Sequence, residues 1–279
     1  MNLENIIKEG SRILKKNNIH SHKLDAEIII SNLMKIKKET LVTEYKIDIS
    51  KKILKKYSDA IKRRSKNEPI AYIIGRKEFW SRDFVVNQST LIPRPETELM
   101  LYKLVNFFKN KSINILDIGT GSGCILLSIL KELNLARGIG IDISAKAIQI
   151  AKLNSEKLNL NHRARFNIVN IDKFCNDKYD LIISNPPYIP LKDMKNLSKD
   201  IKNYEPLVAF NGGFDGLDLI KKVIYKSTYL LKNNGLLAIE IGNGQYLKVL
   251  SLLKKFRFRE VGKEYDYKRN VRCIIGTKT

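Results

Sequence analysis

The feature that most constrains the fold is an alternation of short apolar strands with helices, which begins at about residue 95. Such an alternation needs crossover connections, and these place the strands parallel in one sheet with helices on both faces. Two final strands, near 258–266 and 271–277, have only a short link and are expected to form an antiparallel hairpin at the sheet edge. The sequence therefore predicts an α/β, Rossmann-like fold with a mostly parallel seven-stranded sheet. The expected helices are 96–109, 123–133, 144–158, 216–232 and 244–255, and the strands before the hairpin read INILDIG, GIGIDI, ARFNIV, YDLIIS and LLAIEIG.

The region before this alternation has a different pattern. Residues 1–68 place apolar side chains three and four positions apart, which predicts a small helical domain, with Ser21 and Ser50 as helix caps. In residues 69–92 the strings PIAYIIG and FWSRDFVV are rich in β-branched and aromatic residues, so we expect a β-hairpin linker. The α/β domain then covers residues 93–279.

Composition excludes several classes of protein. The chain has 279 residues, 43% of them hydrophobic, which excludes a disordered chain. It has no apolar run of about 18 residues, and its N-terminal residues lack the apolar core of a secretory signal. Its 3 cysteines form no C-x-x-C pair, so we expect neither disulfides nor a metal site. These observations predict a cytoplasmic protein without a membrane segment.

The net charge of 51 − 29 = +22 has two interpretations. Lys and Arg neutralise phosphates, which favours a nucleic-acid partner. However, 38 Lys stand beside 38 Ile and 25 Asn but only 13 Arg, and this pattern is typical of biased codon usage. We favour the second interpretation. Residues 1–68 carry 17 basic and 9 acidic side chains, so they hold 17 − 9 = +8 of the total.

A glycine-rich loop follows the first strand of the α/β region. Residues 119–123 read GTGSG, and glycines there allow a tight turn and a close approach of the backbone to a ligand. Asp142 ends the next strand, where a carboxylate can accept both hydroxyls of a ribose. The G-x-G-x-G spacing is shorter than the G-x-G-x-x-G of a pyrophosphate site, which favours S-adenosylmethionine over a dinucleotide. Asp172, after the third strand, is either a hydrogen-bond partner for the adenine amino group or an ordinary helix cap.

The string Ser184-Asn185-Pro186-Pro187-Tyr188 follows the fourth strand and is the most specific chemical signal in the chain. A planar NH2 group is a poor nucleophile because its lone pair is delocalised. The side-chain oxygen of Asn185 and the carbonyl of Pro186 can accept its two N–H groups and hold the lone pair toward a methyl donor. The ring of Tyr188 offers a flat face. This predicts methyl transfer to nitrogen, without choosing among a glutamine amide and the amino groups of adenine, cytosine and guanine.

Further strings carry a family resemblance. EPIAYIIGRKEFW, LIPRPETE, LDIGTGSGCI, SNPPYIP and YEPLVAFNGGFDGL closely resemble the HemK/PrmC family of peptide chain release factor glutamine methyltransferases. The resemblance implies methylation of the glutamine in the Gly-Gly-Gln motif of release factors, with S-adenosylhomocysteine as product, no metal, and an N-terminal domain that recognises the substrate. It implies substrate contacts to Asn185, Pro186, Pro187 and Tyr188. It implies cofactor contacts to Gly119, Thr120, Gly121, Ser122, Gly123, Asp142, Asp172, Lys173 and Asn185.

Three details accompany this resemblance. Many relatives have an aromatic residue where this chain has Lys173, so we expect Phe174 to be an alternative cover for the adenine. In LIPRPETE, Pro95 suits the first turn of a helix, and Glu96 and Glu98 are favourable at its positive end. Cys124 is expected to be a small packing residue.

Two functional hypotheses remain distinct. The leading one is an enzyme whose partner is a release factor, with neither a membrane nor nucleic acid required. The alternative is a methyltransferase for exocyclic amines of RNA or DNA bases, which would use the same NPPY chemistry after base flipping. The net charge is the only feature that favours the alternative, since no recognition region is inserted between the motifs.

Overall fold

The computed structural model describes residues 3–42, 49–175 and 178–278, and its chain divides into two compact units. One unit comprises Met1–Arg76 together with Ser198–Tyr204, and the other comprises Lys77–Leu197 and Glu205–Thr279. The chain therefore passes from one unit to the other three times, after residues 76, 197 and 204. Within the described residues no helix is both long and apolar enough to cross a membrane.

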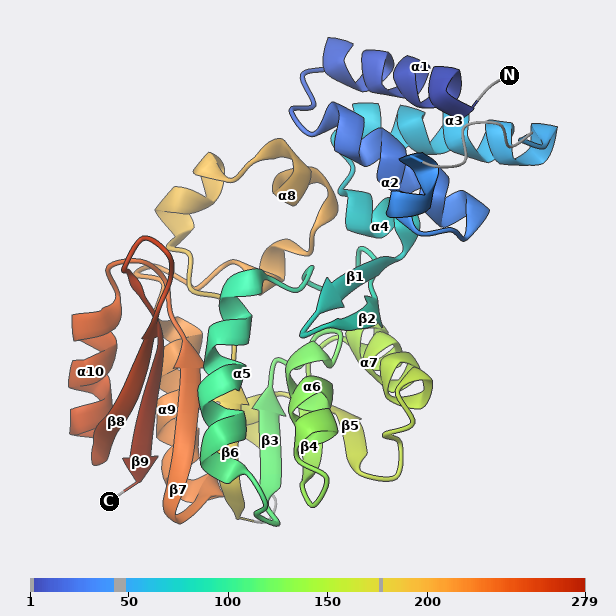
Figure 1. The fold of residues 1–279 in the computed structure, drawn as a ribbon. Helices are drawn as coiled ribbons and strands as arrows, with labels where there is room; N and C mark the ends of the chain where they lie inside the picture. Colours follow the sequence, from blue (N-terminus) through green and yellow to red (C-terminus); the bar gives the residue numbers. More distant parts are fainter. Residues whose placement is uncertain (1–2, 43–48, 176–177, 279) are drawn as a thin grey trace. The chain divides into compact units, whose positions relative to one another are not determined.

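The larger unit is built on a seven-stranded sheet in the order β5-β4-β3-β6-β7-β9-β8 (Figure 1). The strands from β5 to β7 pair in parallel, while β9 pairs antiparallel with both β7 and β8, as the sequence predicted. The strands are β3 Asn114–Ile118, β4 Arg137–Asp142, β5 Ala164–Ile168, β6 Tyr179–Ser184, β7 Leu231–Glu240, β8 Phe258–Tyr265 and β9 Val271–Lys278.

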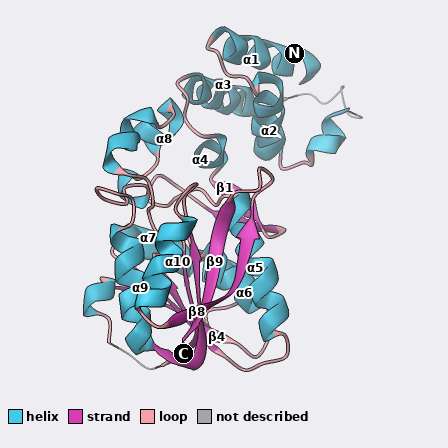
Figure 2. Ribbon diagram, turned by 90° about the vertical axis from the view of Figure 1, so that its left-hand side faces the viewer, coloured by secondary structure: helices cyan, strands magenta, loops and turns pink. Residues whose placement is uncertain are grey.

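Helices cover both faces of this sheet, and side chains of alternating parity fill the two cores. In β6, Leu181 and Ile183 pack into the core on one face while Ile182 packs into the core on the other. Figure 2 shows α5 and α6 on one side of the strands and α9 and α10 on the other. Residues of α5, α6 and α7 pack together in the core that contains Leu181 and Ile183, which we call the first core. The helices are α5 Pro95–Phe108, α6 Cys124–Glu132, α7 Ala145–Lys157, α9 Asp218–Leu230 and α10 Tyr246–Lys255.

Shorter segments complete this unit. The 3-10 turns are η2 Ile171–Lys173, η3 Leu191–Asn196 and η4 Leu207–Ala209. Pro95 lies in the first turn of α5 together with Glu96 and Glu98, and Cys124 is buried in the first core, as expected. Burial raises the pKa of the Cys124 thiol to about 12.

The expected hairpin is present, but its first strand begins later than predicted. Strands β1 Arg76–Phe79 and β2 Arg82–Val85 form a two-stranded sheet, whereas residues 70–74 form the helix α4 Ile70–Ile74. The prediction of a strand over PIAYIIG was therefore wrong. Pro69 fixes the start of this helix and Gly75, at φ 74°, ends it in the left-handed conformation.

The smaller unit is helical. Its elements are α1 Leu3–Lys16, α2 His22–Met34, η1 Lys38–Val42, α3 Lys51–Ser65, α4, and α8 Lys199–Tyr204. The side chain of Ser50 accepts a hydrogen bond from Ile53 N at 3.4 Å and caps α3, as predicted. Ser21 precedes α2, but its hydroxyl donates to the Asp25 carboxylate at 2.7 Å instead of capping the helix backbone.

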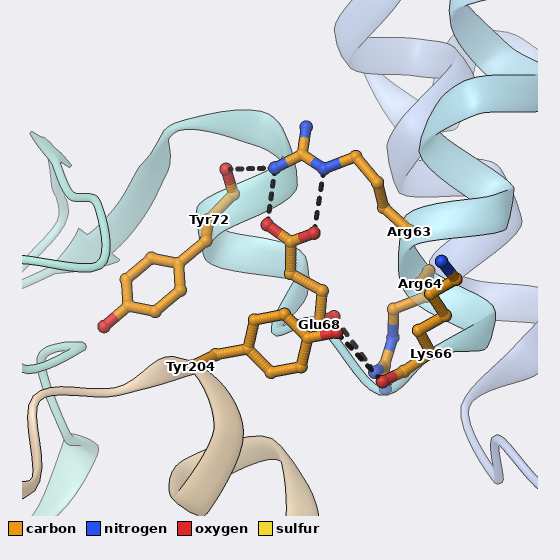
Figure 3. Close-up of polar contacts among 6 residues, drawn as sticks. All are labelled: Arg63, Arg64, Lys66, Glu68, Tyr72 and Tyr204. Carbon is orange, nitrogen blue, oxygen red and sulfur yellow. Dashed lines mark hydrogen bonds and ion pairs between the residues drawn. The ribbon is translucent and has the colours of Figure 1, made fainter.

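A buried carboxylate ties the end of α3 to α4 (Figure 3). The Glu68 carboxylate accepts hydrogen bonds from Arg63 Nε at 2.8 Å and Arg63 Nη2 at 2.5 Å. The Glu68 backbone carbonyl accepts a third from Arg64 at 3.2 Å. In the same cluster the hydroxyl of Tyr204 donates to the carbonyl of Lys66 at 3.1 Å. The segment 198–204 is thus hydrogen-bonded within the helical unit although it is about 130 residues away in the chain.

Candidate active site

The candidate site lies beyond the carboxyl ends of adjacent parallel strands. The chain runs from β3 to β4 and β5 on one side and returns to β6 on the other, so the strand order reverses between β3 and β6. Ligands bind at such a reversal in open α/β sheets. Ile118 and Ser184 are paired there, and the Ser184 hydroxyl donates to the Ile118 carbonyl at 2.9 Å. The glycine loop and Asn185 therefore leave the sheet side by side.

The glycine loop has the backbone that its sequence predicts. Gly119, Gly121 and Gly123 have φ values of 74°, 54° and 77°, a region that other residues rarely adopt. A Cβ added at Gly119 would meet no atom within 4 Å, so this part of the loop faces open space. Asn154, fully buried on α7, donates to the Ser122 carbonyl at 2.9 Å and supports the loop from below.

Asp142 closes β4 next to this loop. One of its carboxylate oxygens accepts from Gly121 N at 3.0 Å and the other from Ser144 N at 2.9 Å. Each oxygen retains lone-pair capacity for a further donor. The carboxylate is therefore held in place by backbone amides and remains able to accept hydroxyl groups.

Asp117 lies beneath the loop and is fully buried at the end of β3. Its Oδ2 accepts from the Thr120 hydroxyl at 2.7 Å, whereas its Oδ1 has no hydrogen-bond partner. Burial, reinforced by the charge of Asp142, raises the pKa of Asp117 to about 7. A carboxylate that titrates near neutrality thus supports the turn of the glycine loop.

Asn185, after β6, is connected to a buried chain of polar side chains. Its Nδ2 donates to Thr97 Oγ1 at 3.2 Å, and Thr97 Oγ1 donates to Glu240 Oε2 at 2.6 Å. Thr97 and Glu240 are each 2% exposed. Glu240 ends β7, the strand that pairs with β6, which explains why it lies beside Asn185. Burial raises the pKa of Glu240, while the Thr97 hydrogen bond and the charge of Arg272 oppose that shift.

Tyr188 belongs to the same chain of contacts. Its hydroxyl donates to Glu240 Oε1 at 3.4 Å and accepts from Arg272 at 3.1 Å, and the Arg272 guanidinium lies 5.5 Å from the centre of its ring. Burial and the nearby Glu240 carboxylate raise the pKa of Tyr188 to about 12. The phenol is therefore neutral at physiological pH, and its ring is fixed at the edge of the site.

A small cavity opens between these groups and encloses about 30 Å³. A space of that size has room for about two water molecules. Its lining residues are Leu91, Arg94, Asn185, Tyr188, Ile189, Ala209, Phe210 and Glu240.

The segment after NPPY is held by the glycine-rich string downstream. Ile189 N donates to the Phe210 carbonyl at 2.9 Å, and Gly212 N returns a bond of 2.9 Å to the Ile189 carbonyl. Gln245 Nε2 donates to the carbonyls of Tyr188 at 3.0 Å and Gly216 at 3.1 Å. These bonds give the NPPY loop a fixed backbone.

The LIPRPETE and YEP strings meet through one ion pair. Arg94 donates to Glu205 Oε1 at 2.5 Å, and Ile92 N donates to Glu205 Oε2 at 3.1 Å. The Glu205 side chain is 1% exposed. Two motifs that are 111 residues apart therefore form one wall of the cavity.

The predicted adenine contacts lie elsewhere on the sheet edge. Asp172 is exposed and pairs with Lys222 at 2.8 Å, and Lys173 beside it is exposed. Phe174 is 5% exposed and packs in the core near Tyr179, so it presents no free face. Its expected role as a cover for adenine is not supported by this burial. The contacts of Asp172 and Lys173 with a cofactor stay predictions.

Several residues of the site were not predicted from the sequence. Glu240 carries a usable signal, because a charged residue closes the apolar run LLAIE at the carboxyl end of a strand. Thr97 was overlooked between Glu96 and Glu98, which resemble ordinary helix-start residues. The others join the site through distant pairings: Arg94, Glu205, Gln245 and Arg272.

Comparisons with known protein families agree with this architecture. The profile of the PrmC N-terminal domain matches residues 5–75, and that of a methyltransferase domain matches residues 109–243. Among solved structures, a methyltransferase from Pyrococcus furiosus superposes with a TM-score of 0.53 at 18% identity, covering 79% of this chain and 98% of that one. At that identity the likeness shows the fold alone, and it confirms the predicted fold class.

Full-length relatives are more similar in sequence. The release factor glutamine methyltransferase of Buchnera aphidicola subsp. Schizaphis graminum is 40% identical over 278 residues, which covers 100% of both chains. The release factor glutamine methyltransferase of Clostridium acetobutylicum is 34% identical over 284 residues, covering 100% of this chain and 99% of the relative.

Proposed function

The chain belongs to the family of release factor glutamine methyltransferases, and from this premise we propose that it methylates the side-chain amide nitrogen of a glutamine in a peptide chain release factor. The methyl donor is S-adenosylmethionine. The resemblance in sequence further specifies the glutamine of the Gly-Gly-Gln motif. Release factors act in translation, so we propose that the enzyme works in the cytoplasm.

The glycine loop and Asp142 have the chemistry to hold the methyl donor. The open backbone at Gly119 lets a ligand approach closely, and the two oriented oxygens of Asp142 suit the hydroxyls of a ribose. S-adenosylmethionine, when bound, supplies an electrophilic methyl group. We propose the same loop for the predicted contacts of Thr120, Ser122 and Gly123, and the separate turn after β5 for those of Asp172 and Lys173 with the adenine.

The NPPY loop has the chemistry to hold the substrate amide. The Oδ1 of Asn185 and the carbonyl of Pro186 accept the two N–H groups of the amide, and the ring of Tyr188 supports its planar face, with Pro187 shaping the loop between them. Fixed carbonyl dipoles stabilise the positive charge that develops on nitrogen as the new N–C bond forms. The proton that this nitrogen then loses can leave to solvent without a dedicated base.

The observation that carries the proposal is the small cavity between Asn185 and Tyr188. Its volume of about 30 Å³ suits the flat end of a primary carboxamide. A purine base would need the walls formed by Arg94, Phe210 and Ile189 to move apart, although these are tied by the Arg94–Glu205 pair and by backbone bonds. The full-length relatives, which are release factor glutamine methyltransferases, support a glutamine substrate over the amino group of a nucleic-acid base.

A labelling experiment tests the proposal. The enzyme is incubated with methyl-labelled S-adenosylmethionine and, in separate reactions, a release factor, the same factor with its motif Gln changed to Ala, ribosomal RNA, and DNA. We expect label only in the unmodified factor. Label in nucleic acid but not in the factor would refute the proposed substrate.

A further inference from the structure

The direction of one buried hydrogen bond determines how Asn185 is oriented. A threonine hydroxyl has a single proton to donate. Thr97 Oγ1 donates to Glu240 Oε2 at 2.6 Å, so the single proton of Thr97 is directed at Glu240. Toward Asn185, whose Nδ2 lies 3.2 Å away, Thr97 Oγ1 can then act only as a hydrogen-bond acceptor.

This polarity excludes one of the two orientations of the Asn185 carboxamide. An oxygen facing Thr97 would leave two acceptors in contact, and a buried pair of that kind is costly. The NH2 group of Asn185 must therefore face Thr97, and the carboxamide oxygen faces the opposite way. Since Asn185 lines the cavity, this is the orientation that offers an acceptor to an incoming N–H group.

The surroundings of Glu240 maintain its role as acceptor. Its second oxygen receives the hydroxyl of Tyr188 at 3.4 Å, and that hydroxyl in turn accepts from the Arg272 guanidinium at 3.1 Å. Burial raises the pKa of Glu240, and the positive charge of Arg272 opposes that rise and favours the ionised carboxylate. Thr97 and Tyr188 thus both direct their only protons at Glu240.

We propose that Thr97, oriented by Glu240, is a positioning residue that keeps the Asn185 carboxamide oxygen directed at the substrate amide. This inference rests on the proposed function and adds to it the groups that set the polarity of the substrate acceptor. Thr97 touches neither substrate nor methyl donor in this scheme and acts only through Asn185. Sequence spacing does not reveal the arrangement, because 88 residues separate Thr97 from Asn185 and 143 separate it from Glu240.

Three variants test the inference in steady-state assays with a release factor. Thr97→Val keeps the shape of the side chain but removes the hydroxyl, so we expect kcat to fall about 10- to 100-fold while the Kd for S-adenosylmethionine stays within about threefold. Thr97→Ser restores the hydroxyl and should recover most of kcat. Glu240→Gln can present either end of its amide to Thr97, and we expect a kcat between those of the other two variants.

A matched control separates positioning from packing. Thr90 is 1% exposed, and its hydroxyl donates to the Asn87 carbonyl at 3.2 Å. Thr90→Val should lower the unfolding temperature about as much as Thr97→Val while leaving kcat within about twofold. Wild-type kcat in both Thr97→Val and Glu240→Gln would overturn the inference. An inactive wild-type enzyme in the same assay would instead refute the proposed substrate.

Discussion

Asn185 illustrates how much of the site is decided by single side chains. Asn185 directly follows β6. Its side-chain amide donates a hydrogen bond to Thr97, and the residue lines the cavity. Asn185 combines a side-chain acceptor with the neighbouring Pro186 carbonyl in one turn beside this cavity. Changes at this residue should therefore affect the chemical step far more than the fold.

Asn185→Ala removes the side-chain acceptor for the substrate amide. We expect kcat to fall at least about 100-fold, which is the typical effect of losing one fixed hydrogen-bond partner at a developing charge. The Kd for S-adenosylmethionine, measured by calorimetry, should change by less than about threefold, because Asp142 and the glycine loop remain. Asn167→Ala, at an exposed position of β5, is the control, and unchanged turnover of Asn185→Ala would remove Asn185 from the mechanism.

Asp117 makes the stability of the catalytic unit depend on pH. Burial raises its pKa from the ordinary 3.8 to about 7, so the folded protein holds this proton more tightly than the unfolded chain. The resulting stabilisation is complete below about pH 4 and is lost as the pH rises to about 7. Asp117→Asn abolishes this titration.

We therefore expect the free energy of unfolding of Asp117→Asn, relative to wild type, to rise by about 2 to 3 kcal/mol between pH 5 and pH 8. Urea unfolding of both proteins at several pH values measures the difference, and each protein serves as reference for the other, because all remaining groups titrate alike. Two parallel pH curves would show that Asp117 keeps an ordinary pKa.

Local patterns revealed only part of this site. The GTGSG and NPPY strings are contiguous, so their chemistry can be inferred from neighbours in the sequence. Thr97 and Glu240 acquire a role only from each other, and the packing of α5 against β7, which no local pattern encodes, brings them together. Asp117 was also overlooked, because its raised pKa arises from burial beneath the loop, which no local pattern reveals.

At the scale of elements, the wall of the cavity depends on the ion pair between the start of α5 and the segment before η4. Arg94 and Ile92 N both bind the Glu205 carboxylate, which is almost completely buried. The same carboxylate thereby fixes the entry to α5, the helix that carries Thr97. A change at Glu205 should therefore affect both stability and substrate binding.

Glu205→Ala leaves the Ile92 amide and the Arg94 guanidinium without their acceptor. We expect a loss of about 2 kcal/mol in the free energy of unfolding, less than for a fully buried pair because Arg94 is 32% exposed and can be hydrated. The KM for the release factor should rise, whereas the Kd for S-adenosylmethionine should not. Glu264→Ala removes the partly exposed pair with Lys103 and serves as control, and equal stability losses in the two variants would contradict this role.

Elements with strong periodicity were predictable, and a short one was not. The expected strands and helices of the α/β unit agree with their observed positions to within about two residues, except that β7 begins at Leu231, five residues before the expected strand LLAIEIG. The five residues of α4 are apolar throughout and give no period. Their conformation is set by Pro69 and Gly75 at the two ends, which the β-branched composition obscured.

The charge of the whole molecule bears on how it meets its substrate. The chain carries +22 overall, and residues 1–68 hold +8 of it in about a quarter of the length. Exposed lysines at the start of α3 contribute to this excess. Such a charge attracts an acidic partner surface at a distance and is screened by salt.

We expect the affinity for a release factor to fall as ionic strength rises from about 50 to 300 mM, measured by calorimetry or fluorescence anisotropy. Changing Lys51, Lys52 and Lys55 to Gln should weaken both the affinity and its salt dependence. The same change at three exposed lysines of the larger unit, Lys109, Lys146 and Lys152, provides a control of equal charge. Affinity that is indifferent to salt would mean that the charge reflects composition alone.

The three passages of the chain between the two units limit how this protein can be divided or recombined. A catalytic fragment starting at residue 77 would retain residues 198–204 but lose Lys66, whose carbonyl accepts the hydrogen bond from the Tyr204 hydroxyl. Tyr204 directly precedes Glu205, so the orphaned segment would adjoin the wall of the cavity. Exchanging the helical unit between relatives by a single crossover would pair one parent's residues 1–76 with the other parent's 198–204. Two separate stretches of the gene therefore encode the helical unit. Chimeras should fold well only when both stretches come from the same parent.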